Sequence, residues 1–421
     1  MSEELEQARQ LLAEGDVPGA VRTLRPIADR TPLRELADIV VPLARAVEFE
    51  DLAVAAEAAI ELPSDAKALT TFGYECIERG ISFLAIPVLR EAVRLDPGSA
   101  LALNELVTAF EDEYRHHEAV ETLLAHEASL RPWPDRYLLI YNAILSGDLD
   151  RARAEFATLP PPEDERWLFA RDRVARMLER SDNARTSTPL DWTDLRGWHF
   201  TLTGGYLGTL SPYGFTAGMT GRWAYLGDGP ELCRYSLNRL ALTLSATGHT
   251  PRWVSLLPGR ADRVLGMAAA QLLALPTQPY EPGGVDTLVI AYDLNELDHD
   301  LARTLHERTA GQILFEHASC WTQPPAVSAD ITGLLAQRVN DPWSPGFRVD
   351  GAPAEPDTRS EDELVAEIVR AVGTPDPGDG ATPPDTDADF TAFVAATRDT
   401  WLRGPRTRLN SPGPVRSSSF G

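Results

Sequence analysis

Small and apolar positions recur along the first part of the chain at one fixed offset. Five positions carry the pattern, and their counterparts follow in the same order: Gly15, Ala20, Leu24, Ile27 and Pro32, then Gly80, Ala85, Leu89, Ala92 and Pro97. The offset is about three residues short of two 34-residue periods. Such a period, with small residues where two helices cross and a proline after the second helix, predicts stacked helical hairpins. Because one hairpin cannot bury its apolar face alone, the hairpins must stack, and the stack leaves a concave surface.

The clearest repeat unit runs from Ala66 to Ser99. Apolar and small residues at helical spacing predict a first helix, which Gly80 is placed to end. A second helix is expected to end at Pro97, and Pro87 within it predicts a kink. Weaker units cover residues 1–34, 35–65, 100–133 and 134–161, and a further helix at about 163–181 would cap the array, which gives a repeat domain over 1–185.

Over residues 1–161 this order of large apolar, small and proline positions resembles the tetratricopeptide repeat family. The resemblance implies a peptide- or protein-binding groove lined by the first helix of each pair. The groove-facing offsets fall on Lys67, Thr70, Tyr74, Asn104, Thr108 and Asn142. The alternative is that these residues form ordinary solvated surface. Some family members clamp a peptide carboxylate with several basic residues, but Lys67 is the only lysine of this chain, so we expect no such clamp.

Beyond about residue 185 the pattern changes to short apolar strands that alternate with helices. Aromatic and β-branched residues beside glycine-rich turns predict a hairpin of strands 198–203 and 222–226. Further strands are predicted at 253–257, 287–292 and 312–316, and helices at about 228–247, 261–275 and 300–308. Strands that alternate with helices predict an α/β domain with a mainly parallel sheet, here over residues 190–345.

Ligands of such sheets bind beyond the carboxyl ends of the strands. Gly259 and Arg260 follow one predicted strand and open a helix, an arrangement that can hold an anion. Asp293 and Glu296 follow another, where carboxylates can hold a metal ion or a ribose. The alternative is that these residues are turn and loop residues without a ligand.

Residues 250–300 also faintly resemble the phosphoribosyltransferase family, in which an apolar strand ends in two adjacent acidic residues. Here Tyr292-Asp293 supplies only one, and no glycine- and threonine-rich phosphate loop follows. The resemblance therefore implies at most a degenerate, non-catalytic unit that binds a nucleotide or a sugar phosphate. The sequence contains no complete set of catalytic residues and neither a dinucleotide-binding motif nor a nucleophile-elbow motif. It also lacks closely spaced metal ligands. We therefore expect no cofactor, and we favour a protein that is not an enzyme.

The last part of the chain, residues 346–421, predicts a partly disordered tail with two short helices. Residues 350–360 and 373–388 are rich in Pro, Gly, Asp and Thr, which is typical of linkers. Helices are expected at 361–372 and 390–402. The end carries Arg403, Arg406, Arg408 and Arg416, which either fold back on the acidic protein or bind an acidic partner.

Composition narrows the choice of function. The 421 residues carry a net charge of −24, which disfavours nucleic acid and anionic membrane as partners. No apolar stretch is long enough for a membrane helix, the first ten residues lack a signal-peptide pattern, and the three cysteines are far apart, so we expect a cytoplasmic protein. We therefore expect a protein–protein interaction or regulatory scaffold that binds a peptide or protein through the repeat groove, with oligomeric state left open. The alternative is a ligand-binding or enzymatic α/β domain.

Overall fold

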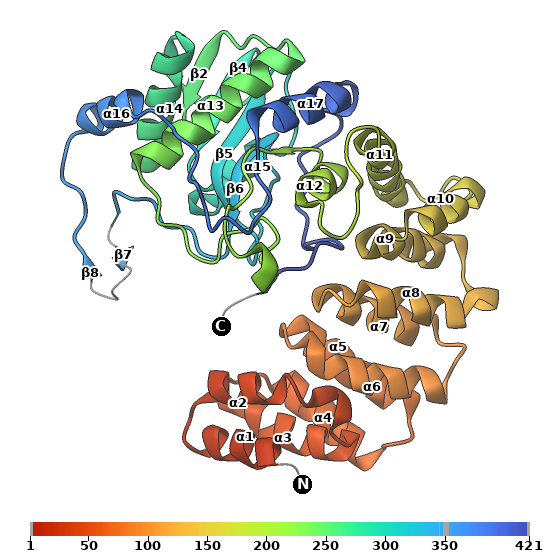
Figure 1. The fold of residues 1–421 in the computed structure, drawn as a ribbon. Helices are drawn as coiled ribbons and strands as arrows, with labels where there is room; N and C mark the ends of the chain where they lie inside the picture. The colour runs from red at the N-terminus through yellow and green to blue at the C-terminus, as the bar shows by residue number, and fades with distance from the viewer. Residues whose placement is uncertain (1–2, 345, 348–352, 419–421) are drawn as a thin grey trace. The chain divides into compact units, whose positions relative to one another are not determined.

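The computed structural model describes residues 3–344, 346–347 and 353–418 (Figure 1). The chain divides into two compact units, Met1–Arg171 and Asp172–Gly421, and each is described by itself. The division lies inside helix α11 (Leu168–Ala184), so most of the helix expected to cap the repeats is assigned to the second unit. Among the described residues, none of the helices combines the length and the apolar character needed to span a bilayer.

The first unit is a run of packed helix pairs, as the repeat pattern predicts (Figure 1). Each pair is joined by a short turn and packs on the next. The helices are α1 (Glu3–Ala13), α2 (Val17–Leu24), α3 (Leu33–Ala46), α4 (Glu50–Glu61), α5 (Ala66–Glu78), α6 (Ser82–Leu95), α7 (Ala100–Asp112), α8 (His116–Ala125), α9 (Tyr137–Ser146) and α10 (Leu149–Thr158).

The pair α5–α6 shows why the small residues recur. A Cβ atom built on Gly73 of α5 would lie 2.4 Å from Cγ of Leu89 on α6, so only glycine allows the two helices to cross this closely. Asp65 caps α5 by accepting a hydrogen bond from the Lys67 amide, and Gly80 ends the turn with φ +70°. Helix α6 runs through Pro87 from Ser82 to Leu95.

The second unit contains an α/β domain with a six-stranded, all-parallel sheet in the order β1-β6-β5-β4-β2-β3. The strands are β1 (Tyr206–Leu207), β2 (Trp253–Leu256), β3 (Thr277–Pro279), β4 (Thr287–Ala291), β5 (Ile313–Cys320) and β6 (Ile331–Ala336). A separate antiparallel pair joins β7 (Gly346–Phe347) and β8 (Pro353–Ala354). Strands β4, β5 and β6 are buried along their whole length, which suits a parallel sheet covered on both faces.

Helices cover both faces of this sheet. Helix α14 (Arg260–Leu273) packs on one face, where Gly266 lies beside Leu256 and Ile290. Helix α15 (His299–Thr304) packs on the other, because its Leu301 contacts the cluster that contains Val289 and Ala291. Helix α13 (Pro230–Thr247) packs with α14, with α16 (Glu361–Arg370) and with α17 (Asp387–Thr397), and α16 also packs with α14 (Figure 1).

The predicted hairpin is wrong. Residues 198–203 lie in helix α12 (Leu195–Thr203), which Asp194 caps through the Gly197 amide and which Gly204 ends with φ +80°. Aromatic and β-branched residues suggested a strand, but the cap and the burial of most of the helix by tertiary packing decide the local structure. Of residues 222–226, Trp223 alone forms a bridge, and this bridge is parallel, to Ala336.

Other predicted bounds differ at their ends. Helix α15 stops at Thr304 rather than at residue 308, and β5 continues to Cys320. Strands β1, β3 and β6 were not predicted from the sequence. The helices of the tail are confirmed as α16 and α17, although α17 ends at Thr397.

The tail packs closely on the sheet domain. Asp385 accepts hydrogen bonds from Arg196 Nη2 and from the Leu210 amide, each at 2.9 Å, so part of the expected linker 373–388 is held in place by specific contacts. Asp379, in the same linker, also accepts a hydrogen bond, from the Gly214 amide at 2.8 Å. In the other expected linker, 350–360, residues 350–352 lie outside the described part of the chain.

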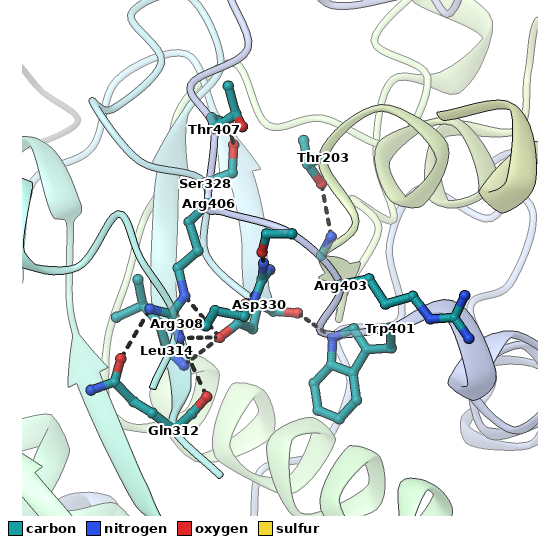
Figure 2. A network of polar contacts seen from close by, with 12 residues as sticks. Thr203, Arg308, Gln312, Leu314, Ser328, Asp330, Trp401, Arg403, Arg406 and Thr407 are labelled. Atoms are coloured by element: carbon teal, nitrogen blue, oxygen red, sulfur yellow. Dashed lines mark hydrogen bonds and ion pairs between the residues drawn. The ribbon is translucent and has the colours of Figure 1, made fainter. Parts of the chain in front are cut away.

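Arg406 folds back on the sheet domain, as one of the two expectations for the basic end predicts. Figure 2 shows its guanidinium beside Asp330, which is fully buried. Asp330 accepts from Arg406 Nη2 and from Arg308 Nη2, each at 2.7 Å, and from the Leu314 amide at 2.9 Å. Burial alone would raise the pKa of Asp330, but Arg308 and Arg406 hold it below its usual range.

Candidate functional site

The first candidate site is a groove on the first unit, between α5 and α7. It has a volume of about 380 Å³. We call it the α5–α7 groove; it is lined by Ala66, Lys67, Thr70, Thr71, Tyr74, Asp96, Ser99, Leu101 and Glu105. Tyr74 is 42% exposed and Leu101 is 63% exposed, so two large apolar side chains face solvent at one groove.

The polar groups of this groove favour a ligand with apolar and basic character. The Thr70 and Thr71 hydroxyls donate to the carbonyl oxygens of Ala66 and Lys67, so their protons are already used. Glu105 is half-buried, and its burial, followed by the nearby Glu78 charge, raises its pKa. Lys67 is exposed at the groove, and the two acidic lining residues, Asp96 and Glu105, outnumber it. A ligand that brings a positive charge would relieve the repulsion between Glu78 and Glu105.

Three of the six residues predicted for the groove line it, namely Lys67, Thr70 and Tyr74. Asn142 is instead fully buried: its amide donates to Glu111 at 2.6 Å and its carbonyl pairs with His116 Nδ1 at 2.9 Å. Asn142 therefore joins neighbouring helices instead of binding a ligand.

Asn104 and Thr108 also lie on α7 but do not line the groove. The Asn104 side chain hydrogen bonds to Asp135, and the Thr108 hydroxyl donates to the Asn104 carbonyl oxygen at 3.1 Å. The helical spacing correctly placed these positions on the first helices of the pairs, but it could not show which side chains the next pair covers.

The second candidate site lies at the carboxyl ends of β2 and β4. These strands are neighbours, yet the chain leaves β2 toward β3 on one side and leaves β4 toward β5 on the other. Ligands of open parallel sheets bind at such a switch point. A cleft of about 390 Å³ opens there, and we call it the switch-point cleft; its lining includes Gly259, Arg260, Asp262, Tyr292, Asp293, Glu296, Asn340 and Asp341. The structure thus brings together all four residues predicted for the alternative site.

The Gly259–Arg260 turn is a poor anion site. Arg260 donates to the carbonyl oxygens of Trp343 at 3.4 Å and Arg359 at 2.9 Å, so its guanidinium holds two loops. Asp262 occupies the first turn of α14, where its Oδ1 accepts from the Tyr292 amide at 2.7 Å. This carboxylate already uses the favourable position for a negative charge at the helix N-terminus.

The carboxyl groups of the cleft are suited to a cation. Burial raises the pKa of Asp262 to about 6 and, together with Glu296 and Asp262, raises that of Asp293 to about 6. Glu316 does not line the cleft, but its Oε1 accepts from the Leu294 amide at 2.9 Å, and burial and then Asp293 raise its pKa. The raised values reflect first the burial of these carboxyl groups and then the nearby negative charges, which water screens poorly there.

Sequence reasoning missed Asp262, Glu316 and Asp341. Asp262 stands three residues after a recognised turn glycine, so its place in the first helical turn was open to inference. Glu316 is one acidic residue inside an apolar strand, and a buried acid of this kind is itself an informative signal.

A further buried cluster was also missed. His317 Nε2 lies 2.9 Å from Asp228 Oδ2, and Cys233 Sγ lies 3.9 Å from the same nitrogen. Among the described residues, this set is close enough to share one metal ion. However, His317 Nδ1 has no described partner, whereas a ligating histidine normally donates its second nitrogen to an oxygen. Burial and then the Asp228 charge raise the pKa of the Cys233 thiol, so it is unsuited to nucleophilic chemistry.

Comparison with protein-family models and with curated proteins found no match for this chain. Neither resemblance noted in the sequence is therefore confirmed by a related protein, and the argument for function depends on the two sites.

Proposed function

We propose that the chain is a protein–protein interaction scaffold of the tetratricopeptide type, whose first unit binds a peptide in the α5–α7 groove. The observation that carries the proposal is the pairing of exposed Tyr74 and Leu101 at a groove of about 380 Å³. Exposed apolar side chains that line a concavity mark binding sites more often than scattered ones do.

The groove favours a peptide with one apolar anchor and a nearby basic residue. An apolar anchor would cover Tyr74 and Leu101, and burial of about 100 Å² of apolar surface is worth about 2.5 kcal/mol. A lysine or arginine of the peptide would face Glu105, whose raised pKa reflects burial and an adjacent acidic residue. The net charge of −24 would speed the encounter with such a peptide.

All three cysteines are free and buried, which supports a reducing compartment such as the cytoplasm as the place of action.

The proposal is tested with a random peptide library displayed on phage and selected on the full-length protein. Selected peptides are then synthesised, and their dissociation constants are measured by fluorescence anisotropy. We expect enrichment of sequences that combine an aromatic or aliphatic residue with a basic one. Tyr74→Ala and Leu101→Ala should each weaken binding about ten-fold or more.

The matched control is Val54→Ala, because Val54 is 54% exposed on α4 and does not line the groove. It should leave the affinity unchanged. Selection of no peptide, or equal binding by all three variants, would reject the proposal.

The crowded carboxyl groups favour a second candidate function, cation binding in the switch-point cleft. A divalent metal ion or an organic amine would offset the burial and the neighbouring negative charges that raise the pKa of Asp293. Calorimetric titration of the full chain with Mg²⁺, Mn²⁺ and spermidine tests this. Binding should weaken as the pH falls through about 6 and should be lost in Asp293→Asn, and no heat with any of the three cations would reject it.

A further inference from the structure

The second unit contains a small cavity away from the switch-point cleft. Its walls come from α12, the end of β5 with the residues that follow, β6 and the C-terminal segment 409–412. The volume is about 80 Å³, which is room for a few water molecules or a small polar ligand. We call it the Arg222 cavity, after the buried arginine that lines it.

Polar atoms without partners gather in this cavity. Four of its lining side chains have buried atoms that make no hydrogen bond to any described residue: Arg222 Nε and Nη1, His199 Nε2, Trp321 Nε1 and Glu316 Oε2. Buried polar groups are normally hydrogen-bonded, and each exception needs an explanation. Five such atoms on four side chains in one small cavity, from segments far apart in the chain, indicate a space built around a polar occupant.

Arg222 sets the charge of that occupant. The residue is 2% exposed, and no ion pair joins it to a carboxylate among the described residues. Its protein contacts are one hydrogen bond from Nη2 to the Pro412 carbonyl oxygen at 3.3 Å and the Trp321 ring, whose centroid lies 5.3 Å from Cζ. A buried charge is normally paired, so the cavity lacks one negative charge.

Burial shifts the other ionisable lining groups toward their neutral forms. Burial lowers the pKa of Arg222 to about 10, so the guanidinium stays protonated. Burial, and then the Arg222 charge, lower the pKa of His199 to about 4, which leaves a neutral imidazole. Burial raises the pKa of Glu316, which favours its protonated form. The cavity therefore presents one positive charge, and burial disfavours a negative charge on Glu316.

We propose that the Arg222 cavity binds a small oxyanion, such as inorganic phosphate or a short carboxylate, with Arg222 as its counter-charge. Arg222 supplies two unused donors, Nε and Nη1, which lie on different edges of the guanidinium, and a charged donor makes a strong hydrogen bond to an oxyanion. Trp321 Nε1 adds a donor, and His199 and Glu316 complete the polar shell. The C-terminal segment lines the cavity through Leu409, Ser411 and Pro412, so a ligand would be enclosed by it.

The test uses the full-length protein and its thermal unfolding at constant ionic strength. Sodium chloride serves as the reference, and sodium phosphate, acetate, pyruvate and succinate are the probes. We expect at least one of them to raise the melting temperature of the second unit in a concentration-dependent way. Calorimetric titration then distinguishes phosphate from the carboxylates by affinity.

Arg222→Met removes the charge and keeps much of the volume, and it should abolish the stabilisation by the anion. In chloride alone this variant should melt at the same temperature as the wild type or higher, because an unpaired buried charge is replaced by an apolar side chain. Arg252→Met is the matched control, since Arg252 is exposed in the same domain; it should respond to the anion as the wild type does.

Trp321→Phe provides a second variant in case Arg222→Met fails to fold. It keeps an aromatic ring beside Arg222 and removes the Nε1 donor, so anion affinity should fall about ten-fold. The proposal is overturned if none of the four probes stabilises the wild type. It is equally overturned if a probe stabilises Arg222→Met as much as the wild type, or binds Trp321→Phe with unchanged affinity.

Discussion

Replacing Asp330 by asparagine removes the negative charge that fixes the C-terminal segment to the sheet (Figure 2). Asp330 pairs with two guanidiniums at 2.7 Å, and the side chains of Asp330 and Arg406 are fully buried while that of Arg308 is 11% exposed. The carbonyl oxygen of the introduced asparagine could still accept from the Leu314 amide, so the change is mainly one of charge.

The expected cost is large because two cations would remain without their counter-charge. Removal of one partner from a buried ion pair costs about 3–5 kcal/mol. For a unit of this size each kcal/mol lowers the melting temperature by about 2–4 °C, so we expect a fall of about 6–20 °C. The pKa of Asp330 is lowered in the folded state, so its contribution is present above its unfolded value of about 4 and is lost as the pH falls through the lower folded value.

Because the chain has two units, one overall unfolding curve does not give the stability of the second unit alone. Hydrogen exchange of peptides from 313–336 and 401–418, measured across a urea series, reports on the second unit directly. Asp300→Asn is the control: its ion pair with Arg303 is exposed and should be worth less than about 1 kcal/mol. A loss below about 1 kcal/mol in Asp330→Asn, or an unchanged exchange of 401–418, would refute the reasoning.

Three further predictions concern packing, pH and thiols. Gly73→Ala should cost about 1–3 kcal/mol in the first unit, because its Cβ would overlap Leu89; an unchanged urea midpoint for that unit would contradict the packing. The pKa of Asp262 is raised in the folded state, so the stability of the second unit should fall as the pH rises from about 4 through 6. Urea titrations at about pH 4.5 and 7.5 should show that Asp262→Asn removes up to about 3 kcal/mol of this loss. Parallel pH profiles of the wild type and the variant would contradict this prediction. A thiol reagent should modify the native protein slowly and modify three thiols in urea, whereas rapid native reaction would disprove their burial; the thiols are Cys76, Cys233 and Cys320.

Much of the fold could be predicted because the patterns are local. Gly73 and Leu89 mark a helix crossing, and the repeat of such positions gives the helix pairs. Strand β4 was equally predictable from the sequence, because its apolar run lies between a turn and an acidic loop. Helix α12 was mistaken for a strand because its aromatic residues carry strand propensity, whereas its Asp194 cap and tertiary packing favour a helix.

The sites could be predicted only in part. The switch-point cleft follows from strand ends, so Arg260 and Asp293 were found together. The Asp262 carboxylate, however, occupies the helix N-terminus at which Gly259 and Arg260 were expected to hold an anion. The Arg222 cavity could not be predicted at all. His199 and Glu316 are brought to Arg222 by the packing of α12 and β5, and no sequence spacing records that proximity.

Peptide recognition by the α5–α7 groove is the central claim, and hydrogen exchange tests it most directly. The full-length protein is compared with and without a saturating concentration of a selected peptide. The account predicts slower exchange confined to α5 and α7, residues 66–78 and 100–112, and loss of that protection in Tyr74→Ala. Protection elsewhere in the chain, with residues 66–112 unchanged, would contradict it.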